Sequence, residues 1–120
     1  MRAVGIILAG GNSNKMRELT HKRAVAAMPI AGSYRAIDFA LSNMSNSHIQ
    51  KVAVLTQYNA RSLNEHLNSS KWWDFGRKQG GLYVFTPTIT KENSFWYQGT
   101  ADAIYQNLDW LKKCHEPYVV

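Results

Sequence analysis

Short apolar segments alternate with segments of helical periodicity along most of this chain. The apolar runs are residues 4–9, 52–56, 82–86 and 118–120. Continuous apolar runs of this kind are typical of strands that are covered on both faces. Their alternation with helices is typical of an open, mostly parallel sheet. The sequence therefore predicts an α/β fold with helices on both faces of the sheet.

Three helices are predicted between these strands, and each has a stripe of residues on one face. The stripes are Ile37, Leu41, Met44 and His48; Ala60, Leu63 and Leu67; and Ile104, Leu108 and Leu111. Ser62 and Glu65 have capping-box spacing in the second helix, and Thr100 can cap the third. Near the start of the first helix, Arg35 and Asp38 are spaced for a local ion pair.

Length, charge and cysteine content narrow the class of protein. The 120 residues suffice for one domain or part of one, and the last apolar run reaches the end of the chain, so we expect residues 1–120 to be the N-terminal part of an incomplete domain. A net charge of +6 favours an anionic partner. Cys114 stands alone, which excludes a disulfide framework and indicates a reducing, cytoplasmic environment.

A glycine pair, Gly10 and Gly11, follows the first apolar run in the segment LAGGNSNKM. The loop matches neither the dinucleotide fingerprint nor the P-loop. Paired glycines nevertheless let backbone N–H groups approach a nucleotide closely, and Lys15 is near enough in sequence to meet a phosphate. Taken alone, the pattern fits a phosphate-binding loop and a plain turn equally well.

The segment LAGGNSNKMRELTHKRAVAAMPIAGSYRAID (8–38) resembles the N-terminal signature of the ADP-glucose pyrophosphorylase (glucose-1-phosphate adenylyltransferase) family. The resemblance continues through residues 41–49, 55–67 and 96–108. It implies a Rossmann-like nucleotidyltransferase domain, truncated here and followed in the family by a left-handed β-helix. It also implies synthesis of ADP-glucose from ATP and glucose 1-phosphate with magnesium, in tetramers that serve glycogen or starch synthesis.

Several loop residues depart from the family pattern. Lys15 replaces an arginine and Val25 replaces a lysine, two cations that in the family would hold the phosphates and the leaving pyrophosphate. Ser13 replaces a glycine, and Glu18 adds an anion in place of a proline. The chain therefore looks most like the family's regulatory, catalytically degenerate glycogen biosynthesis paralogue. That resemblance implies a catalytic homologue as partner, a hetero-tetramer, and binding of ATP or ADP-glucose.

The resemblance also implies a set of nucleotide-binding residues, with Lys15 as the one weak catalytic candidate. The set is Leu8, Ala9, Gly10, Gly11, Gln57, Gly99, Thr100, Ala101 and Asp102. From the residues alone, Gln57 is equally a polar strand end, whereas Thr100 and Asp102 fit an ordinary helix start better than a nucleotide site. No metal site is visible, because the family's magnesium aspartate follows the strand that begins at Tyr118.

Two other functions remain open at this point. A self-sufficient sugar-1-phosphate nucleotidyltransferase would use Lys15 and Lys22 in place of the missing cations, so whether the protein is itself an enzyme is left undecided. A nucleic-acid-binding module would use the basic charge with Trp72 and Trp73. We also expect the open sheet to expose its edges and to make the chain poorly soluble.

Overall fold

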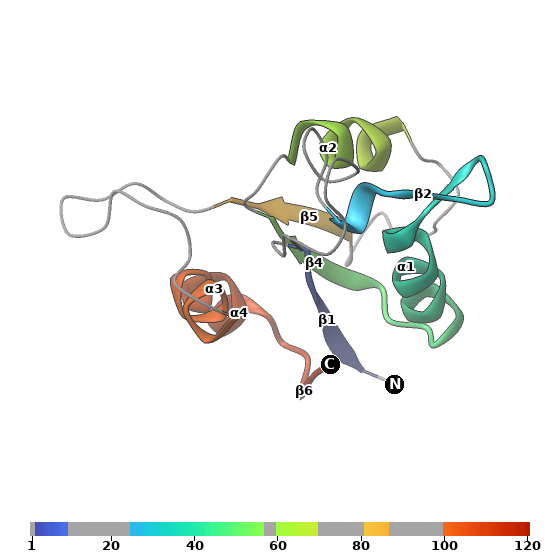
Figure 1. The fold of residues 1–120 in the computed structure, drawn as a ribbon. Coiled ribbons are helices and arrows are strands. Elements are labelled where there is room, and N and C mark those ends of the chain that lie inside the picture. Colours follow the sequence, from blue (N-terminus) through green and yellow to red (C-terminus); the bar gives the residue numbers. More distant parts are fainter. Residues whose placement is uncertain (1, 10–24, 57–59, 70–80, 87–99) are drawn as a thin grey trace, which may run out of the picture.

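A sheet of four parallel strands forms the centre of the described part of the chain (Figure 1). The computed structural model describes residues 2–9, 25–56, 60–69, 81–86 and 100–120. The strands are β1 (Ala3–Leu8), β4 (Lys51–Leu55), β5 (Gly81–Phe85) and β6 (Tyr118–Val119), in the order β5-β4-β1-β6. The prediction of an α/β fold with a mostly parallel sheet is thus confirmed.

Helices cover both faces of this sheet, as predicted. On one face lie the 3-10 helix η2 (Val25–Ala27), α1 (Ala36–Asn46) and α2 (Ala60–Ser69). On the other face lie α3 (Thr100–Gln106) and α4 (Leu108–Lys113) (Figure 1). Successive β-strand side chains point to opposite faces, so a strand between two helical layers has apolar residues at every position.

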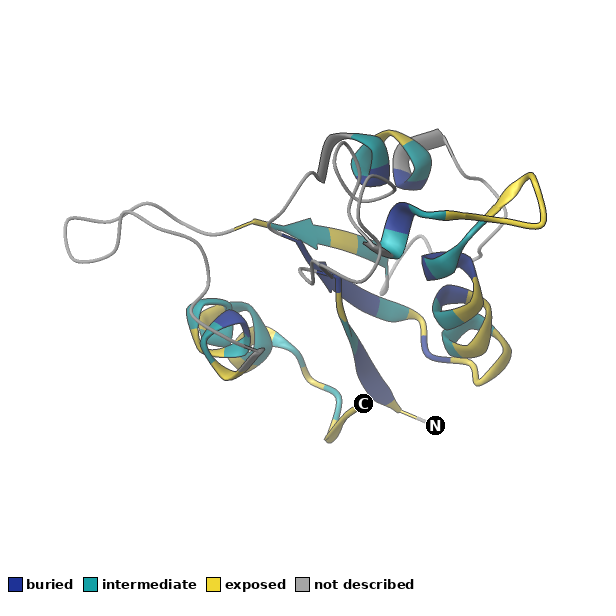
Figure 2. Cartoon of the chain, viewed as in Figure 1, coloured by how far each residue is buried: buried dark blue, intermediate teal, exposed yellow. Residues whose placement is uncertain are grey.

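The central strand β4 shows this alternation directly. Val52 and Val54 are fully buried and pack in the cluster that contains the helix residues of α1 and α2. Ala53 and Leu55 are equally buried and pack in a second cluster with Ala103 of α3. Figure 2 shows β4 and much of β1 as buried, between helices that are partly exposed. One apolar run therefore supplies both halves of the core.

The region before α1 contains a hairpin that the sequence did not indicate. Its strands, β2 (Pro29–Ile30) and β3 (Tyr34–Arg35), pair antiparallel. The predicted ion pair of Arg35 with Asp38 is replaced by a helix cap, in which the Arg35 backbone N–H donates to Asp38 Oδ2 at 2.7 Å. The Arg35 guanidinium instead donates to the Ala27 carbonyl at 2.9 Å and ties the hairpin to η2.

Three helix details differ from prediction. His48 lies beyond the end of α1, exposed and with a φ of 60°, and so is not on the apolar helix face. Ser62 lies inside α2 and does not cap it, because α2 already begins at Ala60. The third helix is split at Asn107, whose side-chain amide donates to the Ala103 carbonyl at 2.8 Å. Such local side-chain bonds compete with the helical backbone ladder.

Candidate functional site

The carboxyl ends of three strands lie level at one edge of the sheet. Leu8 of β1 pairs with Leu55 of β4, and Leu55 pairs with Phe85 of β5. The pairing continues past the strands, where the Ala9 N–H donates to the Leu55 carbonyl at 2.8 Å and the Thr56 N–H donates to the Phe85 carbonyl at 2.9 Å. The chain therefore leaves β1 and β4 at neighbouring points of the edge at which parallel α/β sheets bind ligands.

Several predicted site residues follow these exit points but lie outside the described residues. They are Gly10, Gly11, Lys15, Gln57 and Gly99. The tryptophans of the nucleic-acid alternative, Trp72 and Trp73, lie outside them as well.

A cavity of about 290 Å³ lies beside the end of β1. Its described lining consists of apolar residues of β1, η2 and α1 and of Ala9: Ile7, Leu8, Ala9, Ala26, Ala36, Ile37 and Ala40. Alanines keep this space open, because each carries only a methyl group. An apolar hollow of this size can take part of a ring system, and the described residues that line it carry no charge for phosphate.

Leu8 and Ala9 differ in what they can offer a nucleotide. Leu8 is 46% exposed, so its side chain is free to contact a ligand at the edge of the sheet. Ala9 is buried, and its N–H is already bonded to the Leu55 carbonyl. Ala9 therefore cannot donate this N–H to a phosphate while the pairing persists, and its contribution is limited to shape.

The first turn of α3 lies near the same sheet edge. Ala103, which follows Asp102 directly, packs in one cluster with Leu55, the last residue of β4. Ala101 is exposed, and Asp102 is half-buried and accepts a hydrogen bond from Gln106 Nε2 at 3.0 Å. Thr100 is the first residue of α3. The structure thus brings the start of α3 together with the end of β4, as a shared site requires.

One polar pair was not anticipated from the sequence. His66 Nε2 of α2 donates to Asp38 Oδ1 of α1 at 2.7 Å, and both side chains are largely buried. The two residues are 28 positions apart, so no local spacing could indicate the contact. The pair joins the two helices that cover one face of the sheet.

The described residues offer no magnesium site. Among them, no group of three or more His, Cys, Asp or Glu side chains is placed to hold a metal ion. The carboxylate of Asp102 is bonded to Gln106, and that of Asp38 is bonded to His66 and to the Arg35 N–H. The magnesium ion that the family resemblance implies therefore has no ligand set in this part of the chain.

Comparison with known proteins agrees with this fold. The sequence profile of the nucleotidyl transferase family matches residues 4–120. The parallel sheet with helices on both faces is consistent with that match. The chain belongs to the nucleotidyl transferase family.

Within that family, the chain is similar to curated glucose-1-phosphate adenylyltransferases. It is 45% identical over 117 residues to the enzyme of Thermosipho africanus, covering 98% of this chain and 28% of the relative. The enzymes of Clostridium kluyveri and Halalkalibacterium halodurans are each 46% identical over 117 residues, with 98% of this chain and 30% of the relative covered. The chain thus spans less than a third of the length of these relatives.

One further observation concerns membranes. Among the helices of the described residues, none is both long enough and apolar enough to span a bilayer.

Proposed function

We propose that this chain is the nucleotidyltransferase part of a regulatory subunit of glucose-1-phosphate adenylyltransferase in cytoplasmic glycogen synthesis. The subunit joins a catalytic homologue in a hetero-tetramer and raises its rate. Its own nucleotide site retains contact with ATP or ADP-glucose. The observation that carries the proposal is that, of two phosphate-binding cations, one is lost at Val25 and the other is exchanged from arginine to lysine at Lys15, in a chain that follows most of the enzyme's sequence pattern.

The chemistry of the reaction explains why these two positions matter. When glucose 1-phosphate attacks the α-phosphate of ATP, negative charge gathers on the reacting phosphate and on the leaving pyrophosphate. Preorganised cations stabilise that charge, and removing one such group typically costs about 10²–10³ in rate. Lys15 retains a charge but lacks the planar fork that grips phosphate at two points, and Val25 has no charge at all.

The position of residue 25 supports this reasoning. Val25 is the first residue of η2, and the next residue, Ala26, lines the cavity beside Leu8 and Ala9. The Arg35 guanidinium, bonded to the Ala27 carbonyl, anchors the same short helix. A lysine at position 25 would therefore start close to the exit of β1.

The proposal is tested by following pyrophosphate release from ATP and glucose 1-phosphate with Mg²⁺. The reactions contain the full-length protein that carries residues 1–120 alone, the catalytic homologue of the same organism alone, and the two together. A mixture with heat-denatured chain is the control for non-specific protein effects. We expect no turnover by the chain alone and a higher rate in the mixture than with the homologue alone.

Two results would contradict the proposal. Turnover by the chain alone at the homologue's rate would mean that Lys15 and Lys22 replace the missing cations and that the chain is a self-sufficient enzyme. An unchanged rate in the mixture would remove the regulatory role.

A further inference from the structure

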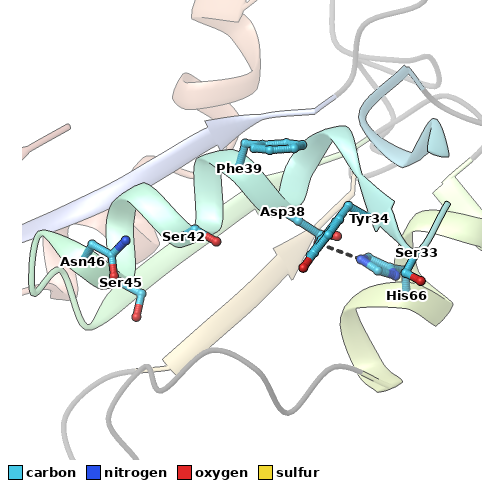
Figure 3. Close-up of a pocket in the computed structure, with 8 residues that line it drawn as sticks. All are labelled: Ser33, Tyr34, Asp38, Phe39, Ser42, Ser45, Asn46 and His66. Atoms are coloured by element: carbon cyan, nitrogen blue, oxygen red, sulfur yellow. Dashed lines mark hydrogen bonds and ion pairs between the residues drawn. The ribbon is translucent and has the colours of Figure 1, made fainter. Parts of the chain in front are cut away.

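A second and larger cavity lies away from the glycine loop, along the outer side of α1. Its volume is about 530 Å³, within the range of small-molecule sites. It extends from the hairpin before α1, along the helix, and across to His66 of α2 (Figure 3). Asp38, Ser42 and Ser45 line it from α1 at spacings of four and three residues, which place them on one face of the helix.

Most polar groups in this cavity are neutral. Ser33, Ser42, Ser45 and Asn46 contribute hydroxyls and an amide, and each is exposed or half-buried. Figure 3 shows Ser42, Ser45 and Asn46 following Asp38 along α1 toward its C-terminal end. Hydroxyl and amide groups both donate and accept hydrogen bonds, so they match a ligand that carries hydroxyl groups of its own.

Two aromatic rings stand at the same cavity. Tyr34 is 59% exposed and Phe39 is 52% exposed, and their ring centroids are 6.3 Å apart. Exposing two adjacent rings to water is unfavourable unless a ligand with an apolar face covers them. The C–H faces of sugar rings have this property, while their edges carry hydroxyl groups.

The described lining of the cavity lacks the lysine and arginine side chains that usually bind a phosphorylated ligand. Asp38 and His66 are the titratable acid and imidazole in the described lining, and neither lysine nor arginine lines it. A phosphate would meet the Asp38 carboxylate without a compensating cation. Asp38 is held by the Arg35 N–H and by His66, both at 2.7 Å, so its oxygens are fixed in place to accept further hydrogen bonds. A preorganised acceptor of this kind reduces the entropic cost of binding.

We propose that this cavity is a binding site for a neutral α-1,4-linked glucan chain, distinct from the nucleotide site. The sugar rings lie against Tyr34 and Phe39, and their hydroxyls bond to the row of side chains along α1 and to Asp38. The choice of glucose as the sugar unit rests on the proposed function in glycogen synthesis. The polar-neutral lining with two exposed rings is independent of that function.

The test uses maltotriose as the probe. Its binding to the full chain is measured by calorimetry, with saturation-transfer NMR to confirm contact of the sugar rings with aromatic protons. Because both rings are more than half exposed, Tyr34→Ala and Phe39→Ala should fold, and their thermal melting is compared with that of the unmodified chain. The matched control is Tyr105→Ala, which removes a 73% exposed ring outside the cavity.

We expect maltotriose to bind, each cavity variant to weaken binding about tenfold, and Tyr105→Ala to leave it unchanged. Three results would overturn the proposal. The first is that maltotriose does not bind. The second is that the cavity variants bind maltotriose as well as the unmodified chain. The third is that glucose 1-phosphate displaces maltotriose, which would locate maltotriose at the substrate site. Altered subunit association with unchanged maltotriose binding would identify the cavity as a protein interface. Maltotriose binding is measured without turnover. A failure of this proposal can therefore be distinguished from a failure of the proposed regulatory function, which is measured by pyrophosphate release.

Discussion

Asp38 connects three parts of the layer that covers one face of the sheet. Its carboxylate caps α1 through the Arg35 N–H and accepts the His66 ring N–H from α2, and the residue is only 8% exposed. Removing a buried acceptor leaves its donors unpaired, which typically costs more than the hydrogen bond itself contributes.

We predict that Asp38→Ala lowers the free energy of unfolding by about 2–3 kcal/mol. Asp38→Asn retains one acceptor oxygen and should lose about half as much. Urea unfolding followed by circular dichroism measures both. Asp109→Ala, an exposed acid in α4, is the control and should change stability by less than about 0.5 kcal/mol. Equal effects of Asp38→Ala and Asp109→Ala would refute the capping role.

Cys114 gives a second prediction at this scale. Burial raises the pKa of the Cys114 thiol, the nearby Lys51 lowers it, and Glu116 raises it further. The thiolate is the reactive form, so a raised pKa leaves less of it at pH 8. We expect iodoacetamide to modify Cys114 several-fold more slowly in the folded chain than in urea. Lys51→Met removes the opposing charge and should slow the reaction further, whereas a faster reaction would show that Lys51 does not act on this thiol.

At the scale of elements, β1 and α1 approach each other closely at Gly5. A methyl group at this position would lie 2.9 Å from Met44 Sδ and 3.3 Å from Val52 Cγ2. We predict that Gly5→Ala destabilises the fold by about 1–3 kcal/mol. In a Met44→Ala background, where the sulfur is absent, the same substitution should cost at least about 1 kcal/mol less. Chemical unfolding of the four proteins of this cycle tests the contact, and strict additivity would argue against it.

Whether a segment is a helix or a strand was predictable, because the spacing of its apolar residues depends on which of its faces pack against other elements. The runs of β1, β4 and β5 are apolar at successive positions because helices lie on both faces of the sheet. The ends of helices were harder to predict, since side chains there compete with backbone N–H groups for the helix carbonyls. Asn107 ends α3 by bonding the Ala103 carbonyl, and a residue-spacing pattern does not distinguish this from a continuous helix.

Positions in the candidate site were predictable from the sequence only where the order of the strands in the sheet determines them. Parallel pairing places the ends of β1 and β4 together, so the positions of Leu8 and Ala9 followed from the fold class. The bond that occupies the Ala9 N–H depends on the exact register and could not be foreseen. The Asp38–His66 pair depends on how α1 and α2 pack, which no local pattern encodes.

At the scale of the whole molecule, the edge of the sheet at β6 is apolar and exposed. Tyr118, Val119 and Val120 are 64%, 58% and 55% exposed, and β6 pairs with β1 on one side. Exposed strand edges recruit other strands, and a charged residue on the edge prevents this.

We predict that the 120-residue chain self-associates and that Val119→Lys reduces the association. Light scattering after gel filtration tests this. Gln50→Lys, which adds the same charge at an exposed position elsewhere, should have little effect.

We propose that the protein has too few phosphate-binding cations for turnover of its own. The most direct measurement is the rate of ADP-glucose formation by the full-length protein that carries residues 1–120, compared with that of its Lys15→Arg/Val25→Lys double variant. We expect no measurable turnover by the unmodified protein and at least about a tenfold gain above background in the double variant, because one cation is restored and the other regains the planar guanidinium. Gln50→Lys should give no gain. Enzyme-like turnover by the unmodified chain would contradict the account.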